Sequence, residues 1–332
     1  MSLRILIIKP SSFGDIVHLF PALALMRKNM PDAELDFVVN PEFAPLLDFS
    51  PFPVRRKIIF ERKRLASCHF LSEVLALRKE LRKEHYDVAV DFQGLFRSGF
   101  LTGLCRADIK AGFFGARERS AEIFYNRKFK SAAGHAVERY GKLARELFKL
   151  DGDLIQPDLP FNSHAAAELP QLPEKYIVLL PGTRWESKRF PPALFARICR
   201  RIQQEFPDYA FVAAGSAGER DIAGAVGDFV INLAGKTSLA GLFELLRNAA
   251  AVVGNDSGPL HAAAALKRHV FGFYGPTEPA LTAPWGDNCR FFFAQCECAA
   301  CLKRICPDGS YRCHELDADL IGKIIAEKLK EC

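Results

Sequence analysis

Short apolar runs alternate with longer segments of helical periodicity along the whole chain. The first run, residues 4–9, is almost wholly apolar and predicts a strand buried on both faces of a parallel sheet. After a polar turn, the pattern over residues 16–26 predicts a helix. The same alternation predicts strands at 35–39, 87–92 and 109–113 and helices at 73–83 and 94–104. This order is typical of strand–helix–strand units around a parallel sheet.

A linker is predicted between about residues 150 and 173, where prolines and Gly152 interrupt the periodicity. The pattern then restarts, with strands expected at 176–180, 209–214, 230–233, 251–254 and 270–274 and a helix at 191–205. We therefore predict an α/β chain with Rossmann-like domains over residues 1–160 and 161–316 and a C-terminal helix over 317–332. Two doubly wound parallel sheets would face each other across a central cleft, with ligands at the carboxyl ends of the strands.

The composition supports a globular chain of two domains. A length of 332 residues fits two domains of ordinary size, and 49% hydrophobic with 25% charged residues excludes a disordered chain. No apolar run approaches the ~18 residues that span a bilayer, and the first residues lack the pattern of a secretory signal. A cytoplasmic protein is expected.

The net charge of +6 is modest, but the cations are clustered in the first half of the chain. Clusters of this kind suit an anionic partner, although each is also compatible with an ordinary solvated face. The clustered residues are Arg55, Arg56, Lys57, Arg62, Lys63, Arg64, Arg117, Arg119, Arg127 and Lys128.

The cysteines fall into two groups. Cys68, Cys105 and Cys199 stand singly in apolar or helical contexts, as buried thiols of a reducing compartment do. A late group has a spacing compatible with a structural zinc site, and its thiols are equally compatible with pairing, or with staying free in a loop that braces the C-terminal helix. This group is Cys298, Cys301, Cys306 and Cys313, preceded by Cys296.

The first strand-to-helix turn contains Ser12, Gly14 and Asp15. Backbone N–H groups are unpaired at such a turn, and Gly14 permits a close approach of a ligand to the backbone. Asp15 has the chemistry of a general base that takes a proton from an attacking hydroxyl. A helix N-cap is the alternative interpretation of this aspartate.

The corresponding turn of the second half, residues 181–188, offers cations and hydroxyls instead of an acid. Thr183 and Lys188 suit a diphosphate and would stabilise the charge of a departing nucleotide. Glu219 follows the next predicted strand, where carboxylates accept hydrogen bonds from ribose hydroxyls.

A second phosphate contact is predicted where residues 252–261 join a strand to a helix through small and hydroxyl residues. Asp256, Ser257 and Gly258 form this turn, and His261 lies on the first turn of the helix. A lone histidine is usually structural, but this one shares its loop with an aspartate and a serine.

In this order and spacing, these motifs resemble the lipopolysaccharide heptosyltransferases of glycosyltransferase family 9, most closely those that add the first heptose. The resemblance covers nearly the whole chain. Its motifs are ILIIKPSSFGD at the start, DVAVDFQGL with Asp91, Gln93 and Gly94, FYNRK, GHAVER with His135, Glu138 and Arg139, GTRWESKRFP, NDSGPLH and FYGPTEP.

The resemblance implies a GT-B fold and a metal-independent, inverting transfer of L-glycero-D-manno-heptose from ADP-heptose onto Kdo, or onto heptose, of the lipopolysaccharide inner core. Asp15 matches the general base of the family. The donor-binding positions are matched by Thr183, Lys188, Glu219, Asp256, Ser257, Gly258 and His261. The acceptor-binding region is matched by Ser12, Gly14, Arg62, Lys63, Arg64 and Arg117.

The resemblance also implies a protein on the cytoplasmic face of the inner membrane that binds Kdo-lipid A or a heptosylated core. A monomer without a cofactor and without a nucleic-acid partner is expected. The Gly-Thr-Arg-Trp turn at 182–185 and the cysteine group are closer to relatives that add the second heptose, so either transfer step is compatible with the chain.

Three alternatives stay open on the sequence alone. A non-hydrolysing nucleotide-sugar epimerase has the same paired architecture, and another family 9 transferase would use a different donor. A nucleic-acid-binding module would use the basic clusters, although such modules usually interleave aromatic residues with their cations.

Overall fold

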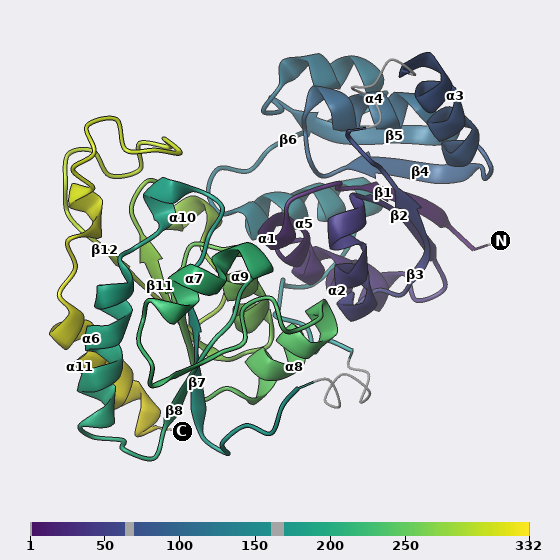
Figure 1. Cartoon of the computed structure of the whole chain (residues 1–332). Coiled ribbons are helices and arrows are strands. Elements are labelled where there is room, and N and C mark those ends of the chain that lie inside the picture. The colour runs from purple at the N-terminus through teal and green to yellow at the C-terminus, as the bar shows by residue number, and fades with distance from the viewer. Residues whose placement is uncertain (1, 64–69, 161–168, 332) are drawn as a thin grey trace. The chain divides into compact units, whose positions relative to one another are not determined.

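The computed structural model describes residues 2–63, 70–160 and 169–331. The chain divides into two compact units, residues 1–161 and 162–332, which we call unit 1 and unit 2 (Figure 1). Each unit contains one parallel sheet with helices around it.

Unit 1 contains a six-stranded parallel sheet in the order β3-β2-β1-β4-β5-β6. The chain builds outward from β1 to β3 and then returns to the other side of β1, so the order reverses between β1 and β4. The strands are β1 (Arg4–Ile8), β2 (Glu34–Val39), β3 (Val54–Ile59), β4 (Tyr86–Asp91), β5 (Ala107–Phe114) and β6 (Arg127–Lys130).

Helices pack on this sheet through buried apolar side chains. Leu81 of α3 and Leu101 of α4 pack in one cluster with Leu6, Val38 and Ala89 of the sheet, while α2 packs against α5. The helices are α1 (Phe13–Val17), α2 (Phe20–Asn29), α3 (Phe70–Leu81), α4 (Phe96–Leu104) and α5 (Ala136–Phe148), with 3-10 turns η1 (Pro41–Phe49) and η3 (Arg119–Phe124).

Unit 2 repeats the topology, with strand order β12-β11-β10-β7-β8-β9 and a reversal between β7 and β10. Its strands are β7 (Tyr176–Leu180), β8 (Ala210–Ala213), β9 (Val230–Asn232), β10 (Ala251–Asn255), β11 (His269–Tyr274) and β12 (Cys289–Phe293). Its helices are α6 (Pro192–Gln203), α7 (Arg220–Gly224), α8 (Leu239–Asn248), α9 (Gly258–Ala265), α10 (Pro279–Thr282) and α11 (Ala318–Leu329), with 3-10 turns η5 (Glu186–Lys188), η6 (Ala217–Glu219) and η7 (Arg312–His314).

The predicted fold class is confirmed, since both sheets are parallel, doubly wound and ordered as in the Rossmann fold. The C-terminal helix α11 packs on α6 of unit 2. None of the described helices combines the length and apolar character needed to cross a bilayer.

The sequence pattern missed three strands at the sheet edges, namely β3, β6 and β12. It also predicted one helix over residues 16–26, where the structure has the separate helices α1 and α2. An edge strand is half-exposed, so it tolerates charged residues: β3 reads VRRKII and β6 reads RKFK.

The cations of β3 are structural, which corrects their interpretation as a site for an anionic partner. Arg55 donates two hydrogen bonds, of 2.9 and 2.8 Å, to the buried carboxylate of Asp36. Arg56 contacts the same carboxylate at 3.5 Å, and the hydroxyl of Tyr86 donates to it at 2.7 Å. Lys57 pairs with Asp48 at the surface.

Replacing Ile198 by alanine should destabilise unit 2. Ile198 of α6 is fully buried in one cluster with Ile321 and Ile325 of α11. Truncation should therefore lower the free energy of unfolding by about 2–5 kcal/mol, as measured by urea denaturation. Arg200→Ala, an exposed position of the same helix, is the control and should change it by less than about 0.5 kcal/mol. Equal losses in the two variants would contradict this packing.

Candidate functional site

The predicted site residues lie on loops at the carboxyl ends of parallel strands. In unit 1 the turn after β1 contains Asp15, and β1 borders the point where the strand order reverses. In unit 2 the turns after β7 and β10 occupy the corresponding positions. Ligands of open α/β sheets bind at such positions, because the loops diverge there and leave a crevice.

Asp15 is held by the start of its own helix. Its Oδ2 accepts hydrogen bonds from the Ser12 backbone N–H at 3.0 Å and from the Ser12 hydroxyl at 2.7 Å. Ser12 is therefore the N-cap of α1, and Asp15 is the third helical residue of a capping box. The alternative interpretation of Asp15 as the N-cap itself is wrong. With 37% of its side chain exposed, the carboxylate is still accessible to a ligand.

Behind Asp15 lies a buried cation that the sequence analysis did not identify. The ammonium of Lys9, 1% exposed, is 3.6 Å from Asp15 Oδ1 and donates to the hydroxyl of Tyr140 at 2.7 Å. Tyr140 in turn donates to Asp15 Oδ1 at 3.2 Å. The available signal was a lysine directly after the apolar run of β1.

These neighbours keep Asp15 ionised. Burial favours the neutral acid, but the charge of Lys9 and the hydrogen bonds from Ser12 outweigh it and hold the pKa of Asp15 well below its ordinary value. Burial lowers the pKa of Lys9 and raises that of Tyr140. At neutral pH the turn therefore presents a carboxylate that is free of a proton.

Exposed cations lie on both sides of Asp15 along the same edge of the sheet. Arg62 and Lys63 follow β3, and Arg117 follows β5; all three are exposed. Both strands are two positions from β1, a separation of about 10 Å. Arg64, predicted with them, lies outside the described residues.

In unit 2 the turns after β7 and β10 are joined by an ion pair. Lys188 Nζ lies 2.5 Å from Asp256 Oδ2, which also accepts from the hydroxyl of Thr277 at 2.7 Å. His261 Nε2 is 3.9 Å from the other carboxylate oxygen. Thr183 donates to the backbone carbonyl of Asp256 at 3.0 Å. Four predicted residues from separate parts of the sequence are thus brought together, and Thr277 is a further member that the sequence analysis missed.

Asp256 is buried and ionised. Burial favours the neutral acid, but the nearby imidazole of His261 and the charge of Lys188 outweigh it and lower the pKa of Asp256. Lys188 also lies over the ring of Trp185, with Nζ 4.6 Å from the ring centre. The aspartate and the indole therefore fix the position of the ammonium.

The start of α9 offers unpaired polar groups. Ser257 is the N-cap and Gly258 the first helical residue, but the serine side chain makes no capping hydrogen bond. Among the described residues, the buried oxygens without a hydrogen-bond partner include Ser257 Oγ, Asn255 Oδ1 and the hydroxyl of Tyr274. A buried polar atom without a partner is costly, so this group favours a ligand that supplies one.

Glu219 packs against the turn after β7. Its carboxylate accepts from the backbone N–H and hydroxyl of Ser216 at 2.7 and 2.8 Å. It also lies so close to Gly182 that a Cβ at that position would be 2.4 Å from the carboxyl carbon. The structure thus places this predicted residue beside the Thr183 turn.

The C-terminal segment that contains Lys303, Arg304 and His314 contacts the turn at residues 181–188. The sequence analysis did not predict this contact. Ser187 donates from its backbone N–H to the carbonyl of Arg304 at 3.1 Å and from its hydroxyl to the carbonyl of Lys303 at 2.6 Å. His314 Nε2 lies 2.7 Å from the carbonyl of Ser187, and its ring stacks on Phe190 with centroids 4.3 Å apart. The segment therefore braces the loop that carries Lys188.

The late cysteines belong to this bracing segment. Cys313 is buried against Gly275, and the sulfur atoms of Cys296 and Cys298 are 3.5 Å apart. Within the described residues all cysteines are free thiols, and no cluster of three or more His, Cys, Asp or Glu side chains is arranged to hold a metal ion. A zinc site at Cys298, Cys301, Cys306 and Cys313 stays a prediction without geometric support. Cys68 lies outside the described residues.

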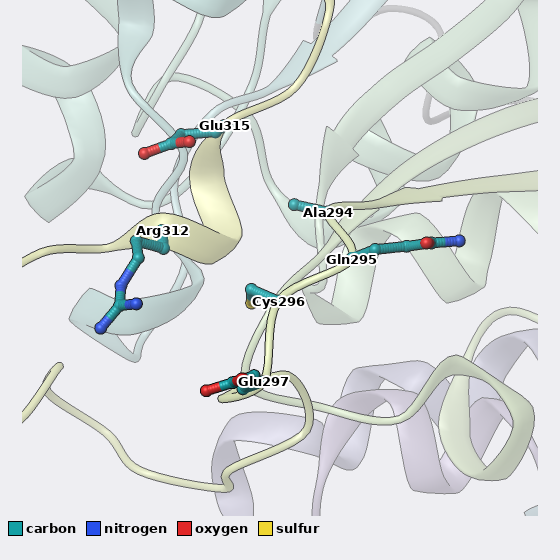
Figure 2. Close-up of a pocket in the computed structure, with 6 residues that line it drawn as sticks. All are labelled: Ala294, Gln295, Cys296, Glu297, Arg312 and Glu315. Atoms are coloured by element: carbon teal, nitrogen blue, oxygen red, sulfur yellow. The ribbon is translucent and has the colours of Figure 1, made fainter.

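A pocket of about 400 Å³ lies in the same segment and is distinct from the site described above (Figure 2). None of the predicted donor or acceptor residues contributes to its walls. Its lining consists of Ala294, Gln295, Cys296, Glu297, Arg312 and Glu315.

An accessible, ionised carboxylate on one Rossmann-like unit, and a fixed lysine beside a helix N-terminus on the other, are the groups that a sugar-nucleotide transferase requires. The family described as "Glycosyltransferase family 9 (heptosyltransferase)" matches residues 74–312, and the chain belongs to this family.

Individual relatives agree with this assignment. Lipopolysaccharide heptosyltransferase 1 of Pseudomonas aeruginosa is 33% identical over 317 residues, which cover 92% of this chain and 87% of that protein. The structure of E. coli heptosyltransferase WaaC with ADP is 28% identical, has a TM-score of 0.79 and is matched over 98% of this chain and 100% of that one. E. coli ADP-heptose heptosyltransferase II, 24% identical with a TM-score of 0.79 and 99% coverage of both chains, shares the fold.

The predicted glycosyltransferase with a GT-B fold is therefore confirmed, as is its place among the heptosyltransferases of lipopolysaccharide core synthesis. The epimerase alternative is not favoured.

Replacing His314 by alanine should loosen the loop that carries Lys188. The variant loses the contact with the Ser187 carbonyl and the stacking on Phe190, so amide hydrogen exchange should accelerate by about tenfold over residues 185–190. His85→Ala, an exposed histidine of unit 1, is the control and should leave that exchange unchanged. Unaltered exchange in the His314 variant would show that the segment does not brace the loop.

Proposed function

We propose that the chain transfers L-glycero-D-manno-heptose from ADP-heptose, with inversion, onto Kdo or heptose of the lipopolysaccharide inner core. The observation that carries this proposal is the accessible carboxylate of Asp15, kept ionised by Lys9 and Ser12. It is supported by the similarity to an E. coli heptosyltransferase whose structures contain ADP and ADP-2-deoxy-2-fluoro heptose.

In the proposed reaction the acceptor hydroxyl oxygen attacks the anomeric carbon of the donor while Asp15 takes its proton. The bond between that carbon and the diphosphate oxygen breaks, ADP leaves with the electron pair, and the configuration at the carbon inverts. Lys9 and Tyr140 serve as positioning residues, because they hold one oxygen of Asp15 while Ser12 holds the other.

The donor diphosphate would be bound by Lys188 and by the start of α9. The lysine ammonium has three N–H donors, of which Asp256 engages one, so two are left for phosphate oxygens. The Ser257 hydroxyl and the backbone N–H of Gly258 would add contacts to the same group. These groups would stabilise the negative charge that develops on the leaving diphosphate.

Other donor contacts come from the rest of the cluster. Glu219 is proposed to accept hydrogen bonds from the ribose hydroxyls, because it follows β8 next to the Thr183 turn. Thr183 and His261 complete the donor side. Asp256 acts mainly through Lys188, since its carboxylate is buried behind the ammonium.

The acceptor would be recognised by its negative charges. Arg62, Lys63 and Arg117 flank the Asp15 turn and suit the carboxylate and phosphate groups of Kdo-lipid A or of a heptosylated core. Ser12 and Gly14 would contact the reacting sugar itself. Such an acceptor implies work at the cytoplasmic face of the inner membrane.

Replacing Asp15 by asparagine tests the proposed base. The amide keeps the shape of the side chain but accepts no proton, so transfer from ADP-heptose to Kdo-lipid A should slow by about 10²–10⁴-fold. Mass spectrometry of the product measures the rate, and calorimetry should give an unchanged Kd for ADP. Asp32→Asn, an exposed aspartate of the same unit, is the control. Transfer at a near wild-type rate in the Asp15 variant would rule out the base assignment.

Replacing Gly182 by alanine tests the donor role of Glu219. The new Cβ would stand 2.4 Å from the carboxyl carbon and displace it, so the Kd for ADP should rise by about tenfold in calorimetry. Gly218→Ala is a closely matched control, because a Cβ at that position meets no atom within 4 Å. If both variants bind ADP as the wild type does, Glu219 does not contact the nucleotide.

A further inference from the structure

Helix α3 of unit 1 exposes two large apolar side chains. Leu71 is 76% exposed and Leu75 is 63% exposed. The opposite face of the helix is anchored normally, because Leu81 is fully buried in the sheet cluster and Leu77 packs against it. The outward leucines are thus a separate apolar face of a well-anchored helix.

Along the helix, the same face continues with two cationic residues, Arg78 and Arg82. Residues 71, 75, 78 and 82 are spaced by four, three and four, so they lie on one side of the helical turn. Arg78 and Arg82 are exposed, and among the described residues neither forms an ion pair. The nearby acids are already engaged, since Glu80 pairs with Arg56 and Glu84 with Arg4. The face therefore combines apolar contact with uncompensated positive charge.

We propose that the face formed by Leu71, Leu75 and Arg78 of α3, together with Arg82 directly after the helix, docks on the surface of an anionic lipid bilayer. The leucines enter the boundary between headgroups and acyl chains, and the arginines pair with lipid phosphates. With 12 residues, α3 is too short to cross a bilayer and lies along its surface. The inference rests on the proposed function, since it brings unit 1 to an acceptor that is itself anchored in such a surface.

Other occupants fit this face less well. A second copy of the chain related by a twofold axis would bring two equal cationic stripes together, which is repulsive. A nucleic acid would engage the arginines but gain nothing from two exposed leucines. Charge complementarity combined with an apolar contact therefore favours a lipid surface.

The test is flotation of the full chain with vesicles. Wild-type protein should float with phosphatidylcholine vesicles that contain about a third phosphatidylglycerol and bind pure phosphatidylcholine at least about tenfold more weakly. Leu71→Ser with Leu75→Ser should reduce binding to anionic vesicles by at least about tenfold. Arg78→Glu with Arg82→Glu should reduce it by at least about 30-fold, because each lost cation near the surface contributes roughly 1 kcal/mol and the two new carboxylates add repulsion.

Matched controls come from exposed positions of unit 2. Leu320→Ser, on α11, controls for loss of an exposed leucine, and Arg200→Glu with Lys323→Glu controls for the change in net charge. Both should float as the wild type does. Urea denaturation should show that the α3 variants keep the wild-type stability, so that a loss of binding is not a loss of fold.

Four results would overturn the proposal. The first three are a wild type that does not float at all, a wild type that binds neutral vesicles equally well, and control variants that lose as much binding as the α3 variants. The fourth is a wild type that forms dimers while the leucine variant is monomeric. Transfer to a lipid-free phosphorylated acceptor sugar separates this proposal from the catalytic one. The α3 variants should retain that activity within about twofold. A wild type that floats but transfers no heptose would contradict the proposed function and leave the lipid surface supported.

Discussion

A charge taken out of water has to be paired, and one lysine–aspartate pair organises the candidate site residues of each unit. The two pairs differ in which member is the more buried. In unit 1 the lysine is buried and the carboxylate reaches the surface, with Lys9 1% and Asp15 37% exposed. In unit 2 the carboxylate of Asp256 is 8% exposed and Lys188 is 16% exposed. Unit 1 therefore presents a base, and unit 2 presents a cation.

The difference arises because the buried member of each pair directly follows a central strand of its sheet. Lys9 comes directly after β1, so its ammonium lies under the turn and finds Tyr140 and the carbonyl of Phe92 as further partners. Asp256 comes directly after β10, where Thr277 and His261 satisfy its carboxylate. The same topology thus supports opposite chemistry, because the residue that follows the strand decides which charge stays inside.

The extent to which the sequence predicted this site depends on how local each contact is. Asp15 and Ser12 were found because they share one strand-to-helix turn, and Lys188 because a cation follows a Pro-Gly-Thr turn. The role of Lys9 was missed because Lys9 ends an apolar run in the sequence, and because its second partner, Tyr140, is 131 residues away. The support of Ser187 by Lys303 was missed for the same reason, since 116 residues separate the two. Buried strands were predicted well, whereas the edge strands β3 and β6 were hidden by their cations.

The basic residues of unit 1 show what a structure adds to a charge pattern. In the sequence the cluster at residues 55–57 looks like the cluster that begins at Arg62. The structure separates them, because Arg55 and Arg56 share Asp36 and pair with Glu34 and Glu80 as well. Arg62 and Lys63 stay exposed. Only cations without a partner in the fold contribute to attraction over a distance. The attraction of unit 1 for an anionic acceptor therefore depends on the second set, and the proposed contact with the membrane depends on Arg78 and Arg82. The first set serves the stability of the sheet.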